Sequence, residues 1–486
     1  MNNGKMQVEE LIRQGLFDDV EKKILALKNI DRKDAAAWAN VARRINRNDL
    51  ALKILNPIVR NQDQRFAVAT AVEKLEYADA LRQFGATEEA WNLLTEINGD
   101  DHPQTLLHQA FCLFSQWRYT EAIPLLQKYI SNSSLSDYAQ CLGQVNLAAA
   151  LIQQPQLNDA LTLVDSLLEK TKTLNFTLLY ANSLELSAQI LIVQKEYDLA
   201  LTVLDQAYPL IKSAGRSTLF VEKWQAIATS LKKNEIVSSL INVSEKARVM
   251  KHWETVRECD LYKALLKGDN HGLHSIYFGT PYPEYRKKIN QMSKQQQEYP
   301  DAFLWSMSDE IPNIIFDSLS GKVSGSNALP LPVGQVLHRF FLLMTQDFYK
   351  PRMTLSLFCH LFPGEVINAN TSVNRVHQVI KRARIWLNHS DIPLEIEENL
   401  GSYRLVLKNN FAIRVFAKPP PLEDKLIEWQ LLISNLSVGS FNIHQVMNLL
   451  ETSESSARRL LNWALDNKKL RRSGQGSKTM YTLILN

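Results

Sequence analysis

Hydrophobic positions in the first half of the chain recur in a short phrase with helical spacing. The phrase is an alanine, a pair of apolar or variable residues, and then two apolar residues. It occurs at Ala51–Leu55, Ala90–Leu94, Ala122–Leu126, Ala160–Val164 and Ala200–Leu204, with alanines 39, 32, 38 and 40 residues apart. Because a small alanine lets two helices approach closely and the apolar pair faces a neighbour, each phrase fits the second helix of a helical hairpin.

These phrases resemble a degenerate tetratricopeptide array over residues 5–235. Tyr119, Leu157 and Tyr197 lie three residues before their alanines, while the Trp, Gly and Pro markers of that repeat are present only in part, for example at Gly85 and Trp117. The resemblance implies stacked hairpins with a curved groove suited to a peptide or a protein surface. An irregular helical domain with a purely structural role is the alternative.

Residues 236–311 are expected to connect this array to the rest of the chain. Helices continue to residue 267, and a long charged helix is predicted from about Glu245 to Lys267. Ser275–Tyr285 then contains three tyrosines, two prolines and a glycine, a cluster expected to dock a loop against a domain. A ligand or phosphate contact by Gly279 and Thr280 is the alternative.

Residues 312–416 show a change of pattern. A strand-like run, Ile314–Gly321, precedes an apolar helix at Val333–Thr345 and a short helix within Pro351–Pro363. A long helix then runs from Thr371 to about Asn388, and Leu394–Val406 reads as a β-hairpin. The buried stripe expected on the long helix is Val373, Val376, Ile380, Ala383 and Leu387. The opposite stripe carries residue types that bind base edges and phosphates, namely Asn374, Arg375, Gln378, Lys381 and Arg382.

This order of elements resembles the OmpR-type winged helix of bacterial regulators. The specific similarities are Leu361–Gly364, Arg382–Leu387 and the hairpin end Gly401–Leu405. In that family the long helix enters the major groove and the wing touches the minor groove or the backbone. The resemblance therefore implies that the polar stripe of the long helix binds DNA, with Ser402 and Arg404 near the wing. No phosphoacceptor receiver domain precedes the module, so activation by phosphorylation is not implied.

Residues 422–486 resemble a second winged helix. Helices are predicted at Leu422–Ser434, at Phe441–Leu450 and, with a serine cap, at Ser453–Leu465. The third helix has an inner face of Ala457, Leu460, Leu461 and Ala464. Its outer face and the basic hairpin that follows supply further candidate DNA contacts, namely Ser455, Arg458, Arg459, Asn462, Arg471, Arg472 and Lys478. A winged helix used only for dimerisation or packing is the alternative.

Charge and composition narrow the function. Residues 331–486 carry a balance of +7, against −3 for residues 1–330, so a polyanion is expected to bind the C-terminal end. The four cysteines are scattered without a close pair, which excludes the signatures of zinc ribbons and CxxC redox sites. No phosphate-binding loop, dinucleotide fingerprint, nucleophile elbow or metal-ligand spacing occurs, so we expect no enzyme activity, no cofactor and no metal. Neither a secretory signal nor a membrane-spanning run is found, which favours the cytoplasm.

The sequence thus predicts a mainly α protein in which a tetratricopeptide-like superhelix precedes two small α+β winged-helix domains. It favours a sequence-specific DNA-binding transcriptional regulator, with double-stranded DNA and a protein or peptide in the repeat groove as partners. Self-association through the repeats to form a homo-oligomer is a further possibility. The alternative is a scaffold whose repeats and winged helices bind proteins rather than DNA.

Overall fold

The structure is a computed structural model that describes residues 7–8, 11–12, 16–27, 30–60, 67–154, 156–293, 299–307, 311–367, 371–418, 424–436, 439–450, 452–474, 476 and 479–484. The chain divides into two compact units. The first comprises residues 1–297 together with 353–359 and 364–373, and the second comprises residues 298–352, 360–363 and 374–486. The finer division predicted from the sequence, into repeats, connector and two winged helices, stays a prediction.

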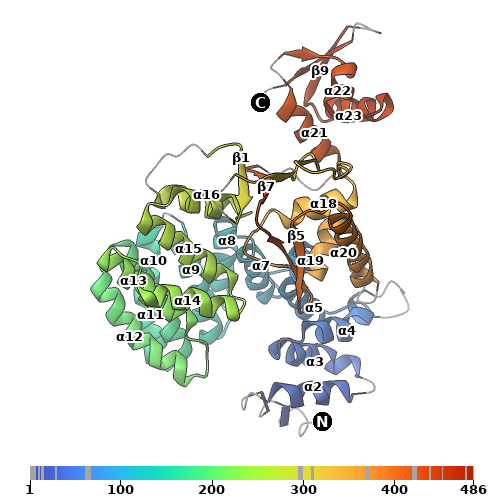
Figure 1. The fold of residues 1–486 in the computed structure, drawn as a ribbon. Coiled ribbons are helices and arrows are strands. Elements are labelled where there is room, and N and C mark those ends of the chain that lie inside the picture. Colours follow the sequence, from blue (N-terminus) through green and yellow to red (C-terminus); the bar gives the residue numbers. More distant parts are fainter. Residues whose placement is uncertain are drawn as a thin grey trace. The chain divides into compact units, whose positions relative to one another are not determined.

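The first unit consists of helices joined by short turns, and consecutive helices pack against one another (Figure 1). They are α2 (Phe17–Leu25), α3 (Arg32–Arg44), α4 (Asn48–Val59), α5 (Ala71–Gln83), α6 (Thr87–Thr95), α7 (Gln104–Phe114), α8 (Tyr119–Ile130), α9 (Asp137–Ile152), α10 (Leu157–Thr173), α11 (Thr177–Val193), α12 (Tyr197–Ser213), α13 (Leu219–Lys233), α14 (Ser238–Val249), α15 (Trp253–Lys267), α16 (Asn270–Phe278) and α17 (Pro283–Met292).

The recurring alanine phrases lie in the second helices of successive hairpins, as predicted. They fall in α4, α6, α8, α10 and α12, and each of the five alanines is fully buried. The apolar residue that ends each phrase is also at most 1% exposed, since it lies four positions later on the same helix face. The chain is therefore mainly α, with tetratricopeptide-like helical hairpins in its first unit.

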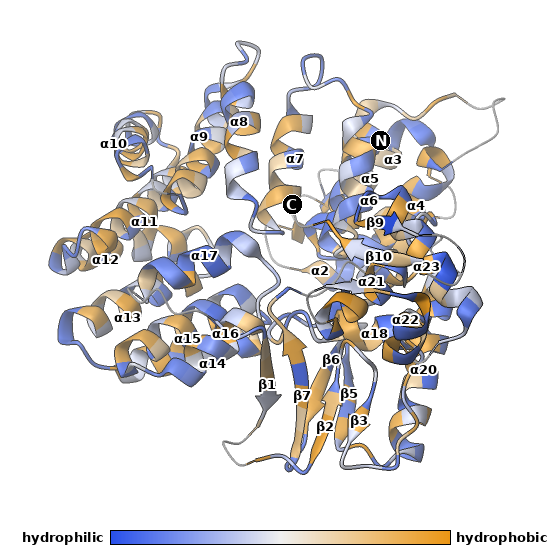
Figure 2. Cartoon of the chain, turned by 90° about the horizontal axis from the view of Figure 1, so that it is seen from above, coloured by the Kyte–Doolittle hydropathy of each residue, from blue (hydrophilic) through white to orange (hydrophobic). Residues whose placement is uncertain are grey.

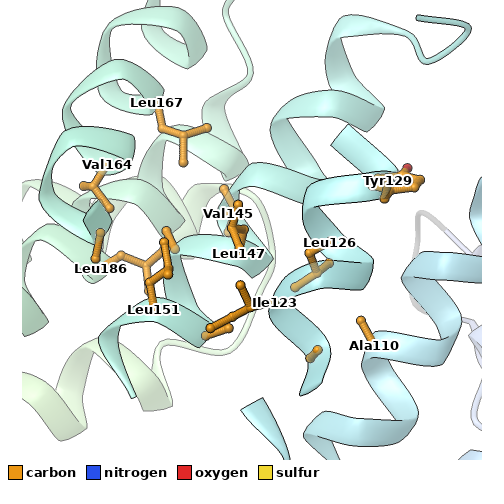
Figure 3. Close-up of a cluster of buried hydrophobic side chains, with 14 of the residues drawn as sticks. Ala110, Ile123, Leu126, Tyr129, Val145, Leu147, Leu151, Val164, Leu167 and Leu186 are labelled. Carbon is orange, nitrogen blue, oxygen red and sulfur yellow. The ribbon is translucent and has the colours of Figure 1, made fainter. Parts of the chain in front are cut away.

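One continuous apolar core links neighbouring hairpins. Around α8 and α9 it includes Leu126, Val145 and Leu151, with Ala110 from α7 on one side and Leu186 from α11 on the other (Figure 3). Because each helix buries residues against the helices before and after it, stability is distributed along the array.

The predicted long helix from Glu245 to Lys267 is wrong. The structure has two helices instead, α14 and α15, separated by a turn in which Lys251 adopts a φ of 58°. A left-handed residue ends a helix, and here the backbone N–H of His252 bonds to the carbonyl of Ala247. The sequence offers no glycine or proline at this turn, so helical spacing alone did not reveal the break.

The second unit opens with a four-stranded sheet in the order β1-β7-β2-β3. The strands are β1 (Ala302–Ser306), β2 (Ile314–Asp317), β3 (Val323–Ser324) and β7 (Phe411–Phe416). β1 and β7 pair antiparallel, with Ala302 opposite Phe416, whereas β2 and β7 are parallel. The strands β1, β3 and β7 were not predicted from the sequence, and β1 was assigned to the connector. β1 and β7 become strands only through pairing with distant residues.

The remaining elements between residues 336 and 407 follow the predicted order, with the unpredicted strand β4 added, and β4 and α19 include residues 353–359 of the first unit. They are α18 (Val336–Met344), β4 (Arg352–Met353), α19 (Thr354–Leu361), α20 (Ser372–His389), β5 (Leu394–Asn399) and β6 (Ser402–Leu407). An aromatic cluster joins sheet to helices, with the ring of Trp386 centred 5.8 Å from Phe316 and 5.2 Å from Phe341. The indole N–H of Trp386 also donates to the carbonyl of Leu329 at 3.1 Å.

The tail forms the second three-helix module. It contains α21 (Asp424–Asn435), β8 (Ser440–Phe441), α22 (Ile443–Leu450), α23 (Glu454–Asp466), β9 (Leu470–Ser473) and β10 (Met480–Leu483), and the sheet order is β8-β10-β9. The predicted inner face of the third helix is buried. Phe441, which the sequence assigned to a helix, lies in β8 and pairs with Tyr481.

Helix α21 packs into both modules of the second unit. On one side Ile427 and Leu431 join Leu319 of the first module in a small apolar cluster. On the other side Trp429 and Leu432 enter the core of the second module. One amphipathic helix therefore connects the two modules through buried contacts.

Hydrophilic residues interrupt the hydrophobic ones along the helices (Figure 2). Within the described part of the chain, none of the helices has both the length and the apolar character that crossing a bilayer requires.

Candidate nucleic-acid interface

Helix α20 separates an apolar face from a polar face. Val376, Ile380, Ala383 and Leu387 are at most 3% exposed, and Val373 is half-buried, so the predicted inner stripe packs inward. All members of the predicted polar stripe are exposed, and they share one side of the helix. They are Asn374, Arg375, Gln378, Lys381 and Arg382.

The charge on α20 has one sign, since four cationic side chains and no carboxylate occur between Ser372 and His389. The side chains of Lys381 and Arg382 have no hydrogen-bond or ion-pair partner among the described residues. Because no nearby carboxylate offsets their charge, cations on such a helix face create a positive potential that attracts a polyanion.

Two further arginines of α20 are held in place by the fold. The guanidinium of Arg375 lies 3.9 Å from the ring centre of Phe362, and that of Arg384 donates to the carbonyl of Ile396 at 2.9 Å. A stacked guanidinium keeps its charge and its in-plane N–H donors. Arg375 is therefore held against Phe362 on the exposed side of α20, whereas the hydrogen bond of Arg384 joins the helix to the β5–β6 hairpin. The roles of Phe362 and Arg384 were not predicted from the sequence, because both depend on contacts between separate elements.

The wing of the first module is the β5–β6 hairpin. Its two-residue turn is Leu400–Gly401, with φ values of 49° and 73°, which is the mirror-image turn that suits a twisted hairpin. Predicted Ser402 begins β6 and is half-buried, opposite Asn399. Predicted Arg404 is exposed, but it forms an ion pair of 2.6 Å with Glu397 on the facing strand.

The third helix of the second module, α23, repeats the arrangement. The hydroxyl of Ser453 accepts the backbone N–H of Ser456 at 3.3 Å, which confirms the predicted serine cap. The predicted outer face borders a shallow surface hollow of about 650 Å³, lined by Glu454, Ser455, Arg458, Arg459 and Asn462. The structure thus brings all four predicted residues of α23 to one surface.

One carboxylate belongs to this surface and was not expected. Glu454 accepts from the guanidinium of Arg458 at 2.6 Å, while Arg459 donates to the hydroxyl of Ser456 at 3.1 Å. The ion pair is more than half exposed on both sides, so it contributes little to stability.

The second wing contributes two more cations. Arg471 and Arg472 are exposed on β9, opposite Thr482 and Tyr481 of β10. Lys478, the remaining predicted contact of this wing, lies outside the described residues.

The four cysteines and Tyr285 of the tyrosine cluster all lie in the packed interior or at its edge. Cys112, Cys141 and Cys259 are buried and Cys359 is partly buried, all as free thiols, and burial raises the pKa of Cys112 to about 12. The segment around Tyr285 is docked, since that side chain is fully buried and meets Trp117, but it was predicted to be a loop and most of it belongs to α16 and α17.

Comparison with known proteins gives a fold likeness only. No protein-family model matches the chain, and none of the curated proteins matches it. The TPR-like repeats of a Podosopora anserina kinesin light chain share 18% identity with this chain. They cover 38% of this chain and 97% of their own, with a TM-score of 0.32.

Two further solved structures are similar at the same level. A Rap protein complexed with competence and sporulation factor is 13% identical, with 56% of this chain and 84% of the Rap chain covered and a TM-score of 0.41. The apo form of RapI is 14% identical, with 59% and 90% covered and a TM-score of 0.33. Likenesses of this size give no basis for carrying a function across.

Proposed function

We propose that the chain is a sequence-specific DNA-binding regulator whose repeats bind a protein or peptide partner. The observation that carries the DNA-binding part is the exposed face of α20, where Lys381 and Arg382 stand without a described ionic partner beside Gln378. Cations supply affinity for phosphates, and the neighbouring amide supplies hydrogen bonds to base edges.

The second module supports the same proposal. Its α23 presents Arg458, Arg459 and Asn462 on one surface, and its wing adds Arg471 and Arg472. Because α21 connects the two modules through buried contacts, one chain carries two candidate recognition helices in one compact unit. A single copy is therefore expected to contact more base pairs than one winged helix does.

The test is selection of duplexes from a randomised library by the full chain, followed by titrations at several salt concentrations. We expect a few sequences to be enriched, and the Lys381→Ala/Arg382→Ala variant to bind them about tenfold more weakly. Loss of two phosphate contacts should reduce the slope of log K against log salt by about 2.

The matched control is Lys172→Ala/Arg216→Ala, which removes the same two charge types from exposed positions of the first unit. We expect it to bind DNA as the wild type does. Salt-dependent binding without sequence enrichment would reduce the proposal to a general affinity for polyanions. Absence of DNA binding by the full chain would leave the protein-binding scaffold as the better interpretation.

A further inference from the structure

Helix α17 lies against the repeats through side chains that reach residues far away in the sequence. The carboxylate of Glu284 accepts the backbone N–H groups of Tyr119 at 2.9 Å and of Thr120 at 3.3 Å, and the side-chain amide of Gln154 at 2.8 Å. Tyr119 and Thr120 are the first residues of α8, whose own preceding residue provides no side-chain cap. An acidic group from α17 therefore caps a helix of another hairpin.

An aromatic contact lies beside this cap. The ring of Tyr285 meets Trp117 edge to face, with centroids 4.5 Å apart, and Tyr282 stacks on the same indole at 6.5 Å. Trp117 lies in the turn between α7 and α8, where it adopts a φ of 57°, and from this turn its indole meets the two tyrosines. The aromatic pair gives the docked helix an apolar anchor.

The third contact is ionic. The ammonium of Lys288 lies 3.1 Å from a carboxylate oxygen of Glu258 and donates to the side-chain carbonyl of Gln153, also at 3.1 Å. Glu258 has a second partner on the repeats themselves, the ammonium of Lys223 at 2.6 Å. Removal of α17 would therefore leave this buried carboxylate paired, which avoids the large cost of an isolated buried charge.

Helix α17 is short and two-sided. It is ten residues long, begins at a proline and follows the hairpin of α15 and α16, to which the guanidinium of Arg286 connects it by hydrogen bonds to the carbonyls of Tyr277 at 3.0 Å and Thr280 at 2.7 Å. Its docked side carries buried Tyr285 and Ile289, while Pro283, Lys287 and Asn290 face outward. Figure 2 shows α17 between α9 and α15, consistent with its bonds to Gln154 and Glu258.

We propose that the surface made of Trp117, the first turn of α8, Gln153, Gln154 and Glu258 is a helix-binding site that α17 fills in cis. The partner it fits is a protein helix with an aromatic residue, a carboxylate one position before it and a lysine three positions after it, as in Glu284, Tyr285 and Lys288. This deepens the partner-binding part of the proposed function, and it does not depend on DNA binding.

The test uses a fluorescein-labelled peptide of residues 280–292 and the full chain. The Tyr285→Ala/Lys288→Ala variant weakens the contact of α17 with the repeats and leaves the surface that receives it unchanged. We expect this variant to bind the peptide at least about tenfold more tightly than the wild type, measured by fluorescence anisotropy, because its site is more often vacant. Adding Trp117→Ala should abolish the binding, and a peptide with Glu284→Gln and Tyr285→Ala should not bind.

A second measurement needs no variant. Amide hydrogen exchange of the wild-type chain should show α17 exchanging at least about tenfold faster than α15, as expected of a segment that detaches while the repeats stay folded. Equal protection of the two helices would show α17 to be part of the core and would overturn the proposal. So would failure of the weakened variant to bind the peptide when its circular dichroism and unfolding midpoint show folded repeats. Neither result would bear on DNA binding.

Discussion

Gly143 of α9 lies so close to Tyr129 of α8 that a Cβ atom added there would be 2.6 Å from the tyrosine ring. The same atom would lie 2.7 Å from the side chain of Ile130, and Tyr129 is fully buried. The two helices approach at this point because one of them lacks a side chain. The glycine is thus a packing requirement of the array rather than a weak point of the helix.

Gly143→Ala is therefore expected to destabilise the first unit, although alanine favours a helix by about 1 kcal/mol over glycine. Overpacking in a close contact costs about 1–3 kcal/mol, which outweighs that gain. Urea unfolding followed by circular dichroism measures the difference. A more stable variant would show that the helices have room to separate.

A buried carboxylate network predicts a pH effect on stability. Asp79 is 3% exposed and lies between Arg43 at 2.6 Å, Arg82 at 2.6 Å and His108 at 3.6 Å. Burial opposes its ionisation, but His108, Arg82 and Arg43 hold the pKa of Asp79 well below its usual range. Asp79→Asn should lower the unfolding free energy at pH 7 by about 1–3 kcal/mol, because the half-buried Arg82 loses its carboxylate partner, whereas Arg43 keeps Glu76 at 3.1 Å.

The sign of the pH dependence follows from the lowered pKa. The stabilisation is complete above the ordinary aspartate pKa of about 3.9 and is lost as the pH falls toward the folded value. The difference between wild type and Asp79→Asn should therefore be constant from pH 7 to 5 and shrink below pH 4. The control is Asp100→Asn, whose carboxylate is 69% exposed and pairs with Lys128. If the loss of unfolding free energy caused by Asp79→Asn grew as the pH fell, this would contradict a lowered pKa for Asp79.

The first wing contains a leucine in an unfavourable conformation. Leu400 has a φ of 49° and is 86% exposed, so its side chain gains little from burial while its backbone is strained. Leu400→Asn creates an Asn-Gly turn, the preferred pair for this hairpin, and should stabilise the second unit by about 1 kcal/mol.

Thermal unfolding provides the measurement for this turn. Leu329→Asn changes another leucine that is 79% exposed, and we expect it to alter stability by less than about 0.5 kcal/mol. An equal effect of both substitutions would attribute the gain to lost surface hydrophobicity instead of turn geometry.

Removal of the carboxylate on the α23 surface should strengthen DNA binding if the proposed function holds. Glu454→Gln frees the guanidinium of Arg458 and removes a charge that repels phosphate. We expect affinity to rise about threefold to tenfold, with less than about 1 kcal/mol lost in stability. Glu121→Gln, which opens an exposed pair of the same 2.6 Å length with Arg118 in the first unit, should leave DNA affinity unchanged. Equal effects of the two variants would argue for net charge instead of a local contact.

Hydrophobic periodicity predicted helices and their buried faces correctly where the pattern depends on a single helix. The alanine phrases identified the second helices from α4 to α12, and the stripe of Val376, Ile380 and Ala383 gave the inner face of α20. The serine cap of α23 was also predicted, since capping depends on neighbouring residues alone. These features need only the 3.6-residue repeat of a helix and the chemistry of its first turn.

Elements that exist only through distant pairing were missed. β1 and β7 are separated by more than a hundred residues, and each is stabilised by hydrogen bonds to the other and not by its own spacing. The break at Lys251 was missed for a different reason, because a lysine adopts the left-handed conformation there and no glycine or proline marks the turn. Strand register depends on the partner strand, which a single window of sequence does not contain.

Sequence periodicity and composition were enough to predict the repeats, the helices and hairpins of the C-terminal modules and the cations that face outward on α20 and α23. The folded chain was needed to show which of those cations are paired, as Arg404 is with Glu397 and Arg458 with Glu454. It also showed that Lys381 stands alone among the described residues, and that α17 binds through contacts such as that of Glu284 with α8. An ion pair or a docked helix depends on distances across the fold, whereas helical periodicity depends on distances along the chain.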